Sequence, residues 1–254
     1  MKKRLSILWS SLGLGVILIT DSANGQPAPE AWVQHHPGSR SVVAVDYGGN
    51  VLVSGTGLEG GGCYTTISYS GQGVPLWTNR YHGPGGAAVV NSIALDANGK
   101  VFVTGYSYAT NGYMDYATIA YSAAGVPLWT NLYNGLASAP ANQDDFPSGI
   151  AVDNNGNVVV TGDSSGDISI RDFATIKYSG AGVPLWTNRY NGWPNANEFA
   201  GGIAIDGSGS VFVAGSSSYA AGRTRSVIIK YSGAGVPLWT NLYSGPRIRM
   251  TSQR

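Results

Sequence analysis

The sequence is poor in charge and in cysteine. Only 11% of its 254 residues are charged, with 15 Lys+Arg against 14 Asp+Glu, whereas about 25% is usual for a soluble domain. So few cations exclude a nucleic-acid-binding protein that works by neutralising phosphates, because such a protein needs a large basic face. The single cysteine, Cys63, excludes an internal disulfide, so the fold must be stabilised by its core.

Helical periodicity is also lacking in the repeated part of the chain. A long helical protein would be rich in Ala, Glu, Lys and Leu, and a disordered one would be rich in charge and poor in aromatic residues. This chain instead has 37 glycines, and 11% of its residues are aromatic. Glycine-containing turns between β-branched and aromatic segments are typical of β-strands. The composition therefore predicts an all-β protein.

The first 25 residues have the layout of a secretory signal peptide. Three cations at residues 2–4 precede an apolar run at residues 5–19, and small residues follow at Ala23 and Gly25. The run is shorter than the ~20 residues that a transmembrane helix needs, which favours a cleaved signal over a membrane anchor. We therefore expect export to the periplasm, the cell surface or the medium, with no membrane insertion after cleavage.

The rest of the chain is one unit repeated four times. The string Gly-Val-Pro-Leu-Trp-Thr-Asn occurs four times, and a second string combines apolar alternation, an aspartate, a glycine-containing turn and further alternation. The tryptophans of the first string, spaced 52, 57 and 53 residues apart, are Trp77, Trp129, Trp186 and Trp239. The aspartates of the second string are Asp46, Asp96, Asp153 and Asp206. Repeats of this length indicate a repeat architecture.

Each unit has the pattern of four short strands. In the second unit we expect strands at residues 92–96, 101–106, 116–122 and 127–133, because these segments are rich in β-branched and aromatic residues and are bounded by turn residues. Asp and Gly in the first turn favour a hairpin, since Asp bonds nearby backbone and Gly adopts positive φ. The pattern predicts a β-propeller of about four four-stranded blades. It disfavours a β-sandwich array, which would not place a tryptophan in every fourth strand.

Two motifs recur in register through residues 41–245. They are Asp-x-x-Gly-x-Val-x-Val-Thr-Gly and Tyr/Phe-Ala-Thr-Ile-x-Tyr-Ser-x-x-Gly-x-x-Leu-Trp. Together they resemble the bacterial seven-bladed β-propeller repeat (SBBP-type) family. The resemblance implies an exported or surface-associated propeller and supplies no catalytic residues.

The chain differs from that family in holding only four full units. Three explanations stay open: a ring of four blades, an incomplete or open ring that self-associates through open blade edges, and a truncated piece of a larger propeller protein. We expect a signal peptide at 1–25, an N-terminal segment at 26–40 that weakly resembles a stray outer strand, and a tail at 246–254. The propeller repeats occupy 41–245, in units at about 41–83, 91–135, 148–192 and 201–245.

The links between strands predict where a ligand would bind. The first and third turns of each unit are nearly identical, whereas the links after the second and fourth strands differ in length and content. In a meandering blade these variable links emerge on one face, and binding sites favour variable loops on a rigid frame. The candidate residues on this face are Tyr106, Tyr108, Tyr113, Asp144, Asp145, Phe146, Arg171, Trp193, Tyr219 and Arg223.

The sequence contains no recognisable catalytic or metal-binding set. Each repeated turn offers one carboxylate, whereas Ca²⁺ takes several oxygen ligands, so we interpret these aspartates as turn residues. The neighbours Asp144 and Asp145 do not by themselves set the facing geometry of a glycosidase. The repeated tryptophans are interpreted as packing between sheets. We expect no cofactor and no metal.

These patterns favour a non-enzymatic exported propeller that serves as a binding or scaffold module. Its partner would be an unidentified protein or glycan. The alternatives are a polysaccharide-active or quinoprotein-like propeller enzyme, and a fragment of a larger propeller protein.

Overall fold

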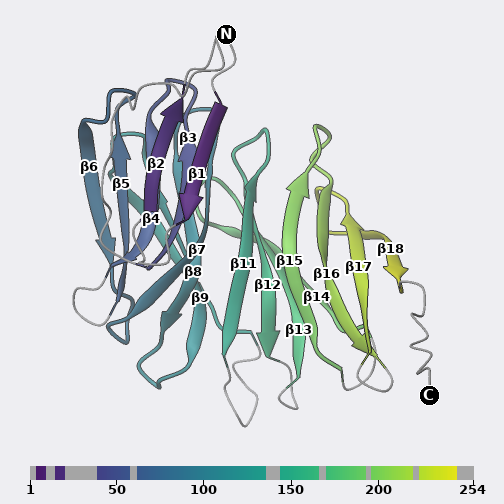
Figure 1. Cartoon of the computed structure of the whole chain (residues 1–254). Coiled ribbons are helices and arrows are strands. Elements are labelled where there is room, and N and C mark those ends of the chain that lie inside the picture. Colours follow the sequence, from purple (N-terminus) through teal and green to yellow (C-terminus); the bar gives the residue numbers. More distant parts are fainter. Residues whose placement is uncertain are drawn as a thin grey trace, which may run out of the picture.

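The computed structural model describes residues 39–57, 62–135, 144–165, 170–192, 196–219 and 223–244, together with the strand backbone at 4–9 and 15–20. Every regular element in these ranges is a β-strand (Figure 1). Within the same ranges, no helix has the length and apolar character needed to cross a membrane.

A small separate sheet lies near the N-terminus. Strands β1 (Arg4–Trp9) and β2 (Gly15–Thr20) pair antiparallel. They fall in the segment for which the sequence predicts a signal peptide. Strand pairing there does not bear on cleavage, so export stays a prediction.

The remaining strands form four four-stranded antiparallel sheets in simple meander order, which confirms the all-β propeller fold. Blade 1 consists of β3 (Ser39–Val45), β4 (Val51–Gly57), β5 (Cys63–Tyr69) and β6 (Pro75–Tyr81). Blade 2 consists of β7 (Ala88–Leu95), β8 (Val101–Tyr108), β9 (Met114–Tyr121) and β10 (Pro127–Tyr133). Blade 3 consists of β11 (Asp145–Val152), β12 (Val158–Ser165), β13 (Arg171–Tyr178) and β14 (Pro184–Tyr190). Blade 4 consists of β15 (Glu198–Ile205), β16 (Val211–Tyr219), β17 (Arg223–Tyr231) and β18 (Pro237–Tyr243).

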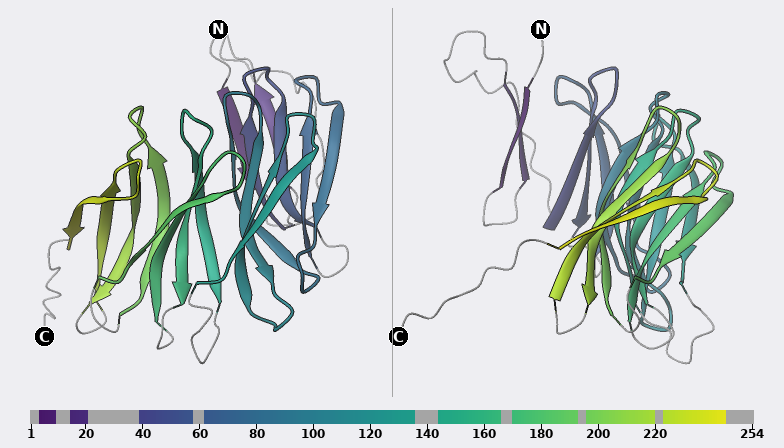
Figure 2. Two further views of the ribbon diagram at one scale, coloured as in Figure 1. Left: turned by 180° about the vertical axis from the view of Figure 1, so that it is seen from behind. Right: turned by 90° about the vertical axis from the view of Figure 1, so that its right-hand side faces the viewer.

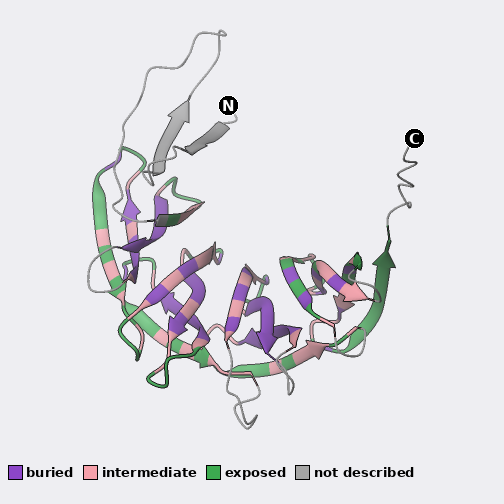
Figure 3. Ribbon diagram, turned by 60° about the horizontal axis from the view of Figure 1, so that its bottom comes forward, coloured by how far each residue is buried: buried purple, intermediate pink, exposed green. Residues whose placement is uncertain are grey.

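The four blades stand side by side in an open arc (Figures 2 and 3). The first strand of each blade lies on the inner side and contacts the first strand of the next blade, from β3 through β7 and β11 to β15. The last strands, β6, β10, β14 and β18, form the exposed outer side. No strand pairing among the described residues joins blade 4 to blade 1, so hydrogen bonds do not close the ring.

Turn chemistry explains why the hairpins form where they do. Asp96 Oδ1 accepts hydrogen bonds from the backbone N–H groups of Asn98 and Lys100, at 2.8 and 2.9 Å. Gly99 completes this turn at φ +77°, a conformation that glycine adopts at little cost. The equivalent carboxylates of the other blades, Asp46, Asp153 and Asp206, accept backbone hydrogen bonds in the same way.

The outer strands of blades 1 to 3 each bond to a turn of the next blade through a tryptophan and an asparagine. Trp77 Nε1 donates to the carbonyl of Ala123 at 3.1 Å, and Asn79 Nδ2 donates to that of Gly125 at 2.7 Å. The same two bonds recur from blade 2 to blade 3 and from blade 3 to blade 4, donated by Trp129, Asn131, Trp186 and Asn188. Trp239 departs from the expected packing between sheets: it is 40% exposed, and no described blade packs against it on that side.

Buried aromatic rings fill the space between blades. Tyr116 and Phe173 are almost fully buried, and each approaches a glycine in the second strand of the following blade. At Gly215, for example, an added Cβ would lie 2.6 Å from the Phe173 ring. Burying such a side chain contributes roughly 1.5–3 kcal/mol. Ser226 takes the corresponding position in blade 4, so the large buried ring is missing on the outward face of that blade.

Candidate ligand-binding cavity on the inner strands

Each inner strand contains a β-bulge at the same place. The pairing register shifts between Val90 and Ser92 in β7, and equivalent shifts occur in β3, β11 and β15. A bulge inserts one extra residue, interrupts the alternation of side chains and redirects the inserted side chain. The four inserted residues are Arg40, Asn91, Ser148 and Gly201.

Three of these bulges line one cavity of about 570 Å³ at the inner strands of blades 1 to 3. Tyr106 and Asp163, near the ends of β8 and β12, contribute to its wall, and Phe146 and Pro147 contribute from the start of β11. The volume lies within the range of small-molecule sites in proteins. The cavity lies at the end of the blades where the variable links emerge.

Two aromatic rings, Tyr106 and Phe146, line the cavity, and Tyr108 and Arg171 contact them from outside it. The rings of Tyr106 and Phe146 meet edge to face with centroids 5.2 Å apart, and Tyr108 lies 6.3 Å from Tyr106. The guanidinium of Arg171 lies 4.5 Å from the centre of the Phe146 ring, which is a cation–π contact. This packing holds the rings in fixed orientations at the cavity.

The charged groups of the cavity differ in how they are compensated. Asp163 is paired with Arg171, with Nη1 to Oδ2 at 2.9 Å, although burial still raises the pKa of this carboxyl above its ordinary value. Arg40 has no ion pair within the described residues. Burial raises the pKa of Tyr106, and the positive charge of Arg40 opposes that rise, which places the two groups in electrostatic contact.

Asn91 ties the cavity to the neighbouring blade. Its Nδ2 donates a hydrogen bond to the carbonyl of Pro147, so the bulge of β7 is joined to that of β11. Its Oδ1 is buried and has no hydrogen-bond partner among the described residues. A buried acceptor without a partner is unusual in folded proteins.

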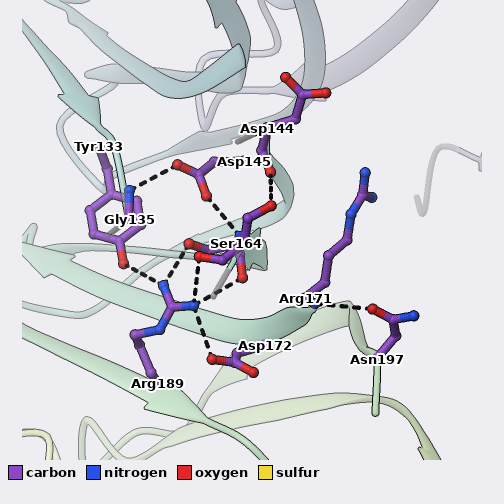
Figure 4. A network of polar contacts seen from close by, with 10 residues as sticks. Tyr133, Gly135, Asp144, Asp145, Ser164, Arg171, Asp172, Arg189 and Asn197 are labelled. Carbon is purple, nitrogen blue, oxygen red and sulfur yellow. Dashed lines mark hydrogen bonds and ion pairs between the residues drawn. The ribbon is translucent and has the colours of Figure 1, made fainter. Parts of the chain in front are cut away.

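A second polar cluster lies beside the cavity, within blade 3 (Figure 4). Asp145 accepts hydrogen bonds from the backbone N–H groups of Gly135 and Ser165, at 2.8 and 3.1 Å, while burial raises its pKa. Arg189 donates to Ser164 Oγ and to the Asp172 carboxylate, at 2.6 and 3.0 Å. These bonds join all four strands of the blade, so the cluster is structural.

Blade 2 has a related cluster without the arginine. Leu132 occupies the register position of Arg189, and Asp115 occupies that of Asp172. Asp115 is only 6% exposed, and its Oδ1 has no hydrogen-bond partner among the described residues. Burial raises the pKa of Asp115 to about 6, and repulsion by Asp145 and Asp144 adds to the effect.

The structure brings together only part of the predicted binding face. Tyr106 and Phe146 line the cavity, and Tyr108 and Arg171 contact them. Residues elsewhere on the face do not reach it. Asp144 accepts a hydrogen bond from the backbone N–H of Met114, and Tyr113 is exposed. Tyr219 and Arg223 are neighbours across two strands of blade 4. Trp193 lies outside the described residues.

Sequence reasoning missed the bulge residues and Asp163. The alternating pattern predicts that the inner strand of blade 2 begins at residue 92, whereas β7 begins at Ala88. The bulge at Asn91 breaks the period of two, so only the part after it has a recognisable pattern. For the same reason Arg40 fell in the predicted N-terminal segment. The one available signal was position: each of these bulge residues directly precedes the alternating segment of its unit.

Comparison with known families agrees with the repeat pattern. Residues 131–169 match the profile of a family described as SBBP, a β-propeller repeat. The match runs from β10 across β11 and β12, so the SBBP segment contains Phe146 and Asp163 of the cavity. The predicted resemblance is confirmed over this segment.

Several solved structures share the fold of this chain. One is a protein of unknown function from Dyadobacter fermentans, with a TM-score of 0.54 and 9% identity over 80% of this chain and 68% of that one. Another is a polysaccharide lyase of family PL25, an ulvan lyase bound to -[GlcA(1-4)Rha3S]-, with a TM-score of 0.57 and 12% identity over 88% and 65%. A further structure of PL25 ulvan lyase has a TM-score of 0.54 and 10% identity over 94% and 70%.

Such low identities show the propeller fold alone. The chain spans about two thirds of the length of these structures, with 68, 65 and 70% covered. No curated protein matches the sequence.

Proposed function

We propose that this chain is an exported, non-enzymatic binding module that holds a glycan in the inner-strand cavity. The observation that carries the proposal is the pairing of Tyr106 and Phe146, 5.2 Å apart, in a cavity that also contains the polar side chains of Asn91 and Ser148. Small-ligand sites combine apolar aromatic walls with a few placed polar groups, and sugars present both apolar C–H faces and hydroxyls. The fold shared with a lyase that holds a saccharide supports a glycan over a protein partner.

Calorimetric titration of the purified chain with a panel of neutral and acidic oligosaccharides tests this proposal. We expect Tyr106→Ala and Phe146→Ala each to weaken binding about tenfold, which corresponds to the loss of roughly one aromatic contact. Tyr113→Ala is the matched control, because Tyr113 belongs to the same set of variable links but does not line the cavity. Equal losses in all three variants, or no binding to any glycan, would contradict the proposal.

A polysaccharide-cleaving enzyme is the second candidate, and Asp115 is the observation that favours it. A carboxyl whose pKa is about 6 is partly protonated near neutral pH, as a general acid must be. Asp144 and Asp145 raise that pKa by their charge and would be the partner carboxylates. Release of reducing ends or unsaturated sugars from a polysaccharide, abolished by Asp115→Asn, would establish the enzyme. Glycan binding without any cleavage would support the binding module.

A further inference from the structure

The bulge position is where the inner strands of the four blades differ in chemistry. Immediately after it, each strand continues with a small residue and an apolar one, such as Ser92-Ile93 and Gly149-Ile150. The inserted residue itself changes from blade to blade: a cation, an amide, a hydroxyl and a glycine. A bulge therefore occurs at the same place in every blade, and the side chain that it carries varies.

The bulge of blade 1 also differs in its backbone. Arg40 has φ of +51°, and it is the only non-glycine residue with positive φ among the described residues. This left-handed conformation is unfavourable for a residue with a Cβ. The inserted residue with the strained conformation is thus the one that carries charge, and strain of this kind is concentrated at ligand sites.

The cavity has a net positive charge at the blade 1 end. Its wall includes one cation, Arg40, and one carboxylate, Asp163. Because Arg171 neutralises Asp163, the charge of Arg40 is left without a compensating partner among the described residues. Arg40 is exposed, so its attraction for an anionic ligand acts through water and should weaken as salt is added.

We propose that the four inserted bulge residues determine which glycan binds, and that Arg40 selects an anionic glycan by binding its carboxylate or sulfate group. This inference rests on the proposed glycan binding. Arg40 would hold the anionic group, since a guanidinium matches carboxylate and sulfate oxygens in a two-point contact. Asn91 and Ser148 would bond hydroxyls further along the chain of sugars. Gly201, the inserted residue of blade 4, has no side chain and leaves space at its position. An added Cβ there would meet only the Ala214 carbonyl, at 3.8 Å.

Matched glycan pairs test the selection by charge. The full chain is titrated by calorimetry with a uronic-acid oligosaccharide and its carboxyl-reduced counterpart, and with a sulfated oligosaccharide and its desulfated form. We expect a preference of at least tenfold for one anionic member at low salt, decreasing as salt is added. The two pairs distinguish a carboxylate from a sulfate as the recognised group.

Arg40→Gly is the decisive variant, because glycine suits the left-handed φ and so removes the charge without harming the fold. It should abolish the preference for the anionic member of each pair. Arg223→Gln, which removes a cation from a variable link of blade 4, should leave the preference intact. Binding without charge preference, or a preference that survives Arg40→Gly, would overturn this inference alone. Failure to bind any glycan would overturn the proposed function as well.

Discussion

Blades 2 and 3 have the same strand register but neutralise buried charge differently. In blade 3, Arg189 bonds the Asp172 carboxylate and Ser164 in one cluster. In blade 2, Leu132 replaces the arginine, and Asp115 forms no ion pair within the described residues. The strands pair in the same register in both blades. The backbone of the repeat is therefore the same, whereas the buried charged side chains differ from blade to blade. The consequence is a carboxyl whose pKa is raised to about 6 in one blade and an ion pair in the other.

Converting blade 3 to the blade 2 pattern should have the largest effect. Arg189→Leu leaves Asp172 and Ser164 without their partner in a poorly solvated site, which we expect to lower the free energy of unfolding by about 3 kcal/mol at pH 7. Urea unfolding followed by tryptophan fluorescence measures this change. Arg223→Leu is the control, since Arg223 forms no ion pair within the described residues. A loss below 1 kcal/mol would mean that the cluster contributes little.

The pH dependence of stability should come from blade 2. The pKa of Asp115 is about 6 in the folded chain against 3.8 ordinarily, so folding favours the protonated carboxyl. This contribution is fully present below pH 4 and is lost as the pH rises through 6. Asp115→Asn should therefore raise the free energy of unfolding at pH 7 by about 1–2 kcal/mol and leave it nearly unchanged below pH 4. Parallel urea titrations at pH 7 and pH 3.5 measure the difference. The same pH profile in the wild type and the variant would refute this expectation.

Giving blade 2 the arginine of blade 3 should have a moderate effect. Leu132 is 44% exposed, so Leu132→Arg adds a guanidinium without opening a cavity. We expect the pKa of Asp115 to fall toward its ordinary value and stability at pH 7 to rise by about 1 kcal/mol. Carboxyl NMR titration measures the pKa. Leu242→Arg in blade 4 is the matched control, because Arg225 takes the register position of Asp115 there and the added guanidinium should stabilise less.

The equivalent serines should show the smallest difference. Ser164 Oγ accepts a hydrogen bond from Arg189 at 2.6 Å, whereas Ser107 has no arginine beside it. Ser164→Ala should cost about 1 kcal/mol and Ser107→Ala less than half of that. Thermal unfolding of the two variants side by side measures the contrast. Equal losses would show that the hydroxyls are stabilised by something other than the arginine.

The architecture was predictable from sequence because its signals are local. Strand alternation and Asp-Gly turns lie within a few residues of each other, and the expected outer strand at 127–133 coincides with β10. The inner ends of the blades were not predictable, because a bulge removes the alternation on which strand recognition depends. Hence the prediction from the variable links includes Tyr106 and Phe146 but not Arg40. The ion pair of Asp172 with Arg189 crosses two strands, and nothing in the spacing of the two residues signals it.

The open face of blade 4 also affects how the molecule unfolds. Trp239 and Asn241 stand where their counterparts in blades 1 to 3 bond to a following blade, yet β18 is exposed along its whole length. In a stack whose units touch only their neighbours, stability is a sum of unit and interface terms. Blade 4 has one such interface with a described neighbour, and blade 3 has two. Blade 1 likewise has one interface with a described neighbour. Cooperativity is therefore weaker at the two ends of the arc than in its middle, and at the blade 4 end local opening should start at β18 and progress inward.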